Sequence, residues 1–119
     1  MSNKDLLLQA AAAMSVGDID HIAEWFTEDF RLHDPAAPPA WPTGHEGARR
    51  MTETLMTLVP GARVEVLDMV EEGDRVAVRW LFSATAENAP VQLSVVAIYR
   101  FVDGRIAEDW GIGFRGPWP

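Results

Sequence analysis

The stretch GDRVAVRW, residues 73–80, decides the fold because it joins a turn signal to a run in which large apolar residues alternate with arginine or alanine. Gly73-Asp74 is typical of a tight hairpin turn. Val76, Val78 and Trp80 then occupy every second position, so in a β-strand their side chains share one face. Arg79 falls on the other face. The stretch predicts a strand that enters from a hairpin and packs one face on a core.

Similar segments follow one another through the second half of the chain. They are rich in β-branched and aromatic residues and cover residues 63–71, 75–86, 91–102 and 105–114. Asp103-Gly104 supplies a further hairpin signal. The sequence therefore predicts four consecutive antiparallel strands. Two of them exceed the usual five or six residues, which favours a curved sheet.

The first half of the chain has helical spacing instead. Residues 3–16 are strong helix formers that end at Gly17, and Asp18 is suited to cap a second helix. A short strand is expected at 30–34, followed by a proline-rich loop and a third helix at 44–58. Helices first and an antiparallel sheet afterwards predict an α+β fold over residues 1–119, with three N-terminal helices on a strongly curved sheet that forms a cone.

Composition limits the classes of function. The chain has 119 residues, 48% of them hydrophobic, which suits a single domain with a sizeable core. It has no cysteine, so disulfides and thiolate chemistry are excluded and the cytoplasm is the expected location. A net charge of −8 disfavours nucleic acid and anionic membranes as partners, and no signal peptide or membrane span is expected. The histidines His21, His33 and His45 lie on separate elements, so neither a metal nor a cofactor is predicted.

The segment Leu32-His33-Asp34-Pro35 holds the first candidate catalytic group. In a strand, Asp34 shares the face of Phe30 and Leu32, where desolvation would raise the pKa of its carboxyl toward the range useful to a general base. His33, on the other face, is a candidate to support it or a surface residue. The alternative is that Asp34-Pro35 is an ordinary turn, because Asp accepts hydrogen bonds from the backbone ahead of it.

Aromatic residues indicate a candidate ligand site. Trp80, Tyr99 and Trp110 come from successive strands and are expected to line one cavity for a small hydrophobic molecule, with Trp41 in the proline-rich loop as its lid. Packing in the core is the alternative for each of them. Trp118, between two prolines, is expected either in a disordered tail or as a plug.

The order of elements and several motifs together resemble the NTF2-like superfamily, which includes ketosteroid isomerases and limonene-epoxide hydrolases, and above all its SnoaL-like, polyketide-cyclase-like branch. The motifs that carry the resemblance are Gly17-Asp18-Ile19-Asp20, Phe26-Thr27-Glu28-Asp29-Phe30, His33-Asp34-Pro35, Gly44-His45-Glu46-Gly47, residues 73–80, residues 99–106 and Trp110. The resemblance implies a cone-shaped domain that binds a small hydrophobic molecule. It specifies the reaction poorly, because most of these residues serve packing and turns.

Catalytic residues carry over unevenly from these relatives. The resemblance to ketosteroid isomerases makes Asp34 the proton-shuttling base, but the hydrogen-bond donors of those enzymes correspond to Ala10 and Ala97 here. The aspartate expected from polyketide cyclases corresponds to Phe114. Asp109, on the same strand, can replace it only if its side chain faces the cone. Alternation with Trp110 places Asp109 outside, whereas a β-bulge would turn it inward.

Three classes of function remain open. The first is an isomerase-, cyclase- or hydrolase-type enzyme with Asp34 as general acid/base. An epoxide hydrolase would also require Arg79 in the site, but alternation along its strand places Arg79 on the outer face of the sheet. The others are a non-catalytic small-molecule-binding module and an assembly module of the same fold. The outer face of the sheet, which includes Arg79, Val96 and Ile98, is partly apolar. It predicts a homodimer formed sheet to sheet, which the resemblance also implies.

Overall fold

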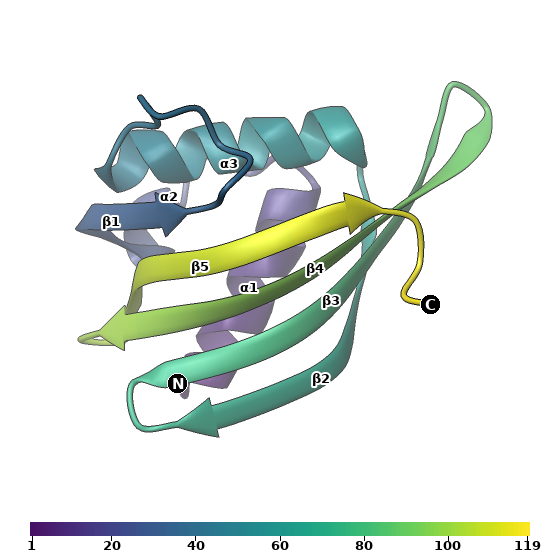
Figure 1. The fold of residues 1–119 in the computed structure, drawn as a ribbon. Coiled ribbons are helices and arrows are strands. Elements are labelled where there is room, and N and C mark those ends of the chain that lie inside the picture. Colours follow the sequence, from purple (N-terminus) through teal and green to yellow (C-terminus); the bar gives the residue numbers. More distant parts are fainter.

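One five-stranded sheet organises the protein in the order β1-β5-β4-β3-β2 (Figure 1). The computed structural model describes residues 1–119. The elements along the chain are α1 (Asn3–Ser15), α2 (Ile22–Trp25), β1 (Phe26–His33), α3 (Gly44–Leu58), β2 (Arg63–Glu72), β3 (Arg75–Ala86), β4 (Ala89–Val102) and β5 (Arg105–Arg115). Strands β2 to β5 form an antiparallel meander, and β1 joins its edge parallel to β5.

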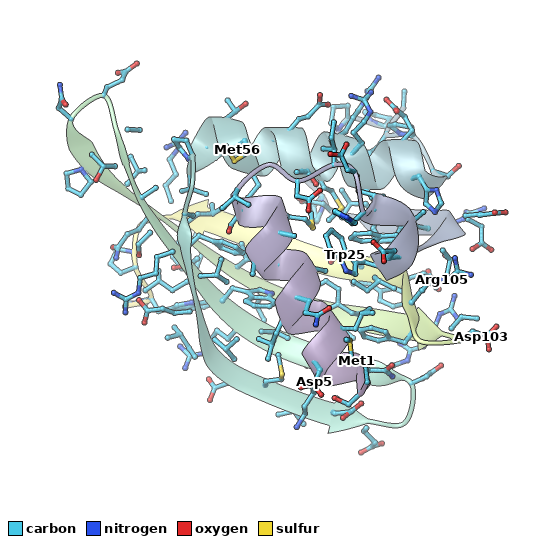
Figure 2. All side chains as sticks on the ribbon, turned by 180° about the vertical axis from the view of Figure 1, so that it is seen from behind. Met1, Asp5, Trp25, Met56, Asp103 and Arg105 are labelled. Atoms are coloured by element: carbon cyan, nitrogen blue, oxygen red, sulfur yellow. The ribbon has the colours of Figure 1, made fainter.

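The sheet twists strongly and carries α1 and α3 on one side, which we call the inner face (Figure 1). Its apolar residues come from alternate positions, such as Val76, Val78, Trp80 and Phe82 of β3, all of them buried. In the view from behind, α1 crosses this face and side chains fill the layer between helix and sheet (Figure 2). The core therefore lies between the inner face and the helices, as the alternation in residues 73–80 predicts.

Glycine ends α1 where the chain must turn back. Gly17 adopts a φ of 78°, a conformation that glycine reaches without steric cost. A Cβ at this position would lie 3.3 Å from Met56 Cγ, so α3 packs closely on the end of α1 (Figure 2). This contact fixes the angle at which the two helices cover the sheet.

The α+β fold and the curved, mainly antiparallel sheet confirm the prediction, with local differences. The second helix is only Ile22–Trp25, and β1 begins at Phe26 rather than Phe30. Asp18 does not cap that helix; its carboxylate accepts hydrogen bonds from the Asp20 amide and from His21 Nδ1 in the preceding turn. No helix of the structure is both long and apolar enough to cross a membrane.

Candidate functional site

A bulge in β5 turns Asp109 toward the interior. The register between β4 and β5 shifts between the pairs Arg100–Glu108 and Phe101–Ile106, which leaves Ala107 as an extra residue. Ile106 and Ala107 are consecutive and both buried, and the alternation after them is reversed. Asp109 is 6% exposed and lies opposite Tyr99 on the inner face. Of the two alternatives that the sequence leaves open, the structure has the β-bulge that turns Asp109 inward, and the outward orientation expected from alternation with Trp110 is wrong.

The Asp109 carboxyl is desolvated and lacks a hydrogen-bond partner. Its Oδ1 is buried and accepts no hydrogen bond. Burial, with a contribution from the negative charge of Asp34, raises the pKa of Asp109 to about 7. A carboxyl with this pKa exists in both protonation states near neutral pH. It therefore has the acid–base behaviour that a proton-transfer catalyst requires.

Small residues lie beside this carboxyl. Ala97 and Gly111 form the next pair of the β4–β5 ladder on the inner face. A Cβ on Gly111 would lie 3.0 Å from Asp109 Oδ1 and 3.4 Å from Ala97 Cβ. The unpartnered oxygen thus occupies the space that a side chain at position 111 would need.

Asp34 lies at the mouth of the site, on the same face of β1 as Leu32. It is half-buried and lines an open cavity of about 420 Å³ together with residues of the proline-rich loop; the lining is Leu32, His33, Asp34, Pro35, Ala37, Pro38, Pro39 and Trp41. Asp34 Oδ1 also accepts a hydrogen bond from the Ala36 amide at 2.8 Å. Asp34 therefore forms the turn that the sequence predicts as one alternative and also lines the cavity. The strongly desolvated carboxyl is Asp109, which corrects the expectation that it would be Asp34.

Leu32 is common to the cavity and to the strand pair that holds the buried carboxyl. It pairs with Asp109 across β1 and β5, and it also lines the cavity. Trp41 also lines the cavity, and its buried Nε1–H donates no hydrogen bond. Its function as a lid stays a prediction.

Trp80 and Tyr99 are core residues that contact each other. Trp80 is 1% exposed, and its Nε1–H donates a hydrogen bond of 2.9 Å to the Tyr99 hydroxyl oxygen. Burial, together with the charge of Asp109, raises the pKa of Tyr99 well above its ordinary value. Neither residue lines the cavity at the mouth. Their connection to the site is through Asp109, which lies opposite Tyr99 in the β4–β5 ladder.

The rings of His33 and Trp110 lie together on the outer face, although His33 also contributes to the lining of the cavity. Their rings stack at 5.2 Å, and the Arg75 guanidinium lies 5.1 Å from the Trp110 ring centroid. His33 Nε2 bonds Glu108 at 2.7 Å, and this contact, with Arg100, lowers the pKa of Glu108. The structure therefore separates Trp110 from Trp80 and Tyr99, and it separates the His33 ring from Asp109. Arg79 is also outside, as predicted, and its Nε bonds Asp68 at 2.7 Å.

The bulge was expected only as an alternative, without a position in the strand, and the structure places it at Ala107. Its available signal is Ile106-Ala107, two successive apolar residues where strict alternation requires a polar one. The structure contains no group of three or more His, Asp or Glu side chains arranged to hold a metal ion. The chemistry that the inner site offers is proton transfer at a carboxyl in apolar surroundings.

Comparison with solved structures identifies the same fold in several relatives. IdmH from Streptomyces antibioticus, a candidate polyketide cyclase, is 25% identical, with 95% of this chain and 92% of that chain covered at a TM-score of 0.78. A candidate polyketide cyclase from Acidithiobacillus ferrooxidans is 23% identical (95% and 91% covered, TM-score 0.81). A SnoaL-like polyketide cyclase from Agrobacterium tumefaciens is 19% identical (96% and 92% covered, TM-score 0.77). The last two likenesses concern the fold alone.

No curated protein matches the chain. The family model of the SnoaL-like domain matches residues 7–109, which include every strand residue up to Asp109. This agrees with the NTF2-like cone that the motifs indicate and with the structural relatives. The chain therefore belongs to the SnoaL-like domain family.

Proposed function

We propose that the protein is a cofactor-independent enzyme that moves a proton on a small hydrophobic carbonyl compound, with Asp109 as general acid/base. The observation that carries the proposal is a buried carboxyl whose Oδ1 has no protein partner. A buried acceptor without a partner is costly to stability, and a bound substrate would supply what it lacks. Membership of a family whose structural relatives include candidate polyketide cyclases supports this class of chemistry.

The Asp109 carboxyl alone can carry out both proton transfers of the proposed reaction. Asp109 as carboxylate accepts a proton from the carbon beside a carbonyl, which gives an enolate and a neutral carboxylic acid. Transfer of the proton from the carboxylic acid to another carbon completes an isomerisation. In D₂O, the carboxylic acid exchanges its proton for a deuteron from solvent and delivers the deuteron to the same carbon, which completes deuterium exchange. General acid–base catalysis of this kind contributes on the order of 10²- to 10⁴-fold to a rate.

Asp34 has a different function in this proposal from the one its sequence context suggests. It lines the cavity through which the substrate approaches, and its charge favours the protonated form of Asp109. The cavity, with Trp41 and several prolines in its wall, would hold the apolar body of the substrate. Leu32 lines this cavity and pairs with Asp109 across β1 and β5.

The experiment is deuterium exchange into 2-tetralone, followed by NMR in D₂O. The wild-type protein should accelerate exchange beside the carbonyl, with a rate that rises with pH through about 7 as Asp109 ionises. Asp109→Asn should remove at least 99% of this acceleration. Asp29→Asn, at an exposed residue of β1, is the control with the same loss of charge and should retain it.

A binding module of the same fold is the second candidate, supported by the unpartnered indole N–H of Trp41 in the cavity wall. It predicts that 2-tetralone binds without exchange and that Asp109→Asn leaves affinity unchanged. Acceleration by the wild type that Asp109→Asn does not affect would contradict the enzymatic proposal, because the proton would then move through another group.

We also propose a second copy of the chain as the partner of the outer face. Exposed apolar side chains gather there on adjacent strands, among them Val96, Ile98, Ile112 and Phe114. A sheet face of this kind is usually covered in the assembled protein. Sheet-to-sheet association would cover these residues and leave the cavity beside the proline-rich loop accessible.

A further inference from the structure

The Tyr99 hydroxyl has a hydrogen that the protein does not use. Trp80 Nε1–H donates to the hydroxyl oxygen at 2.9 Å, so that oxygen acts as acceptor in this contact. The hydroxyl makes no hydrogen bond in which it is the donor. Tyr99 is buried, so its O–H also lacks the freedom to turn toward bulk water.

Tyr99, which carries this unused donor, lies opposite Asp109, whose Oδ1 is an unused acceptor and whose charge contributes to raising the pKa of Tyr99. Tyr99 and Asp109 are partners in the β4–β5 ladder, with both side chains on the inner face. Trp80 pairs with Val95, and Ala97 is the inner-face residue between Val95 and Tyr99 on β4. The hydrogen bond from Trp80 to Tyr99 therefore passes over Ala97. Asp109 Oδ1 lies over the pair of Ala97 and Gly111. Both polar ends thus approach the same small residues.

We infer that Tyr99, held by Trp80, donates its O–H to the carbonyl oxygen of the substrate whose neighbouring carbon Asp109 deprotonates. This inference rests on the proposed function and names a second residue of the site. The O–H remains on Tyr99 throughout: it only shortens its hydrogen bond as negative charge develops on the oxygen. A donor already aimed at that oxygen stabilises the enolate without reorganisation.

The Trp80 bond gives Tyr99 its orientation. Because the indole N–H occupies one lone pair of the hydroxyl oxygen, the hydroxyl hydrogen must point away from Trp80. Trp80 is a positioning residue in this arrangement, and Tyr99 is the residue that touches the substrate. Ala97, at the position where the resemblance to ketosteroid isomerases expects a donor, supplies none.

The test compares two probes of nearly equal shape, 2-tetralone and tetralin, which differ in the carbonyl group. Equilibrium dialysis should show that Tyr99→Phe weakens binding of 2-tetralone about tenfold, the scale of one hydrogen bond, and leaves tetralin unchanged. The exchange rate of bound 2-tetralone should fall further, by ten- to a hundredfold. Trp80→Phe, which keeps a ring but loses the N–H, should give a smaller loss in the same direction.

Infrared spectroscopy supplies a readout that a change in packing does not mimic. The carbonyl stretch of bound 2-tetralone should lie at lower frequency in the wild type than in Tyr99→Phe, because only the wild type donates to it. Asp109→Asn should keep this shift while losing exchange, so failure of the proposed base and failure of the donor are distinguishable. An unchanged stretch, or equal losses of affinity for the two probes, would overturn the inference.

Discussion

Asp109 lies directly opposite Tyr99 across the β4–β5 ladder, and the two ionisable side chains share the apolar inner face. The charge of Asp109 adds to burial in raising the pKa of Tyr99. Burying two such groups together in a core lowers the stability of the fold, and proteins tolerate this cost mainly at functional sites. This pairing is the reason to look for function at the buried end of the cone as well as at its mouth.

Asp109→Asn should stabilise the protein at alkaline pH. The folded-state pKa of about 7 is above the ordinary value of 3.8, so the folded state retains a proton that the unfolded chain loses. The contribution of Asp109 to the free energy of unfolding is therefore largest below about pH 4. It falls as the pH rises to 7, by about 1.4 kcal/mol per pH unit at most. Asparagine does not ionise, so the variant escapes this loss.

Urea denaturation of wild type and Asp109→Asn at pH 5 and pH 8 measures the effect. The variant should gain relative to the wild type by roughly 2 to 3 kcal/mol between these two pH values. Asp29→Asn, on the exposed side of β1, should show no comparable gain. A constant difference between wild type and Asp109→Asn would mean that the carboxyl titrates in its ordinary range.

Asp34→Asn should lower the pKa of Asp109 while leaving it above 3.8. The Asp34 charge is the second cause of the shift, after burial, and burial persists in the variant. Asparagine retains an oxygen that accepts the Ala36 amide, so the turn should be preserved. Titration of carboxyl carbon shifts by NMR measures the change, and the pH profile of exchange should move to lower pH with it.

The contrast between Asp34 and Asp109 shows how far the sequence alone leads. Periodicity predicts the strands, the hairpins and the inner position of Asp34, because alternation and turn chemistry are local. It places Asp109 on the wrong face, because one extra residue at Ala107 reverses every side chain after it. The approach of Tyr99, Trp80 and Asp109 depends on pairing between distant strands, which no local pattern encodes.

Ile98→Glu should dissociate the proposed dimer. Ile98 is 43% exposed on the outer face, between Val96 and Arg100 on β4, and a carboxylate there would be desolvated by a second sheet. Sedimentation velocity at micromolar concentration should give two chains for the wild type and one for the variant. Val16→Glu, at the end of α1 and away from the outer face, should remain dimeric. A wild-type protein that sediments as a single chain would contradict the assembly.

Trp118 anchors the C-terminal segment to the outer face, and two variants should separate how it does so. Its indole N–H donates to the Trp80 carbonyl at 3.2 Å, its ring meets Phe114 edge to face at 5.0 Å, and the Arg79 guanidinium lies 5.2 Å from its centroid. Trp118→Phe keeps the ring contacts and loses only the donor, so it should destabilise the protein by about 1 kcal/mol. Trp118→Ala also loses the ring and should cost about 2 kcal/mol or more. Thermal denaturation measures both, and equal melting temperatures for all three proteins would show that the segment contributes nothing to the fold.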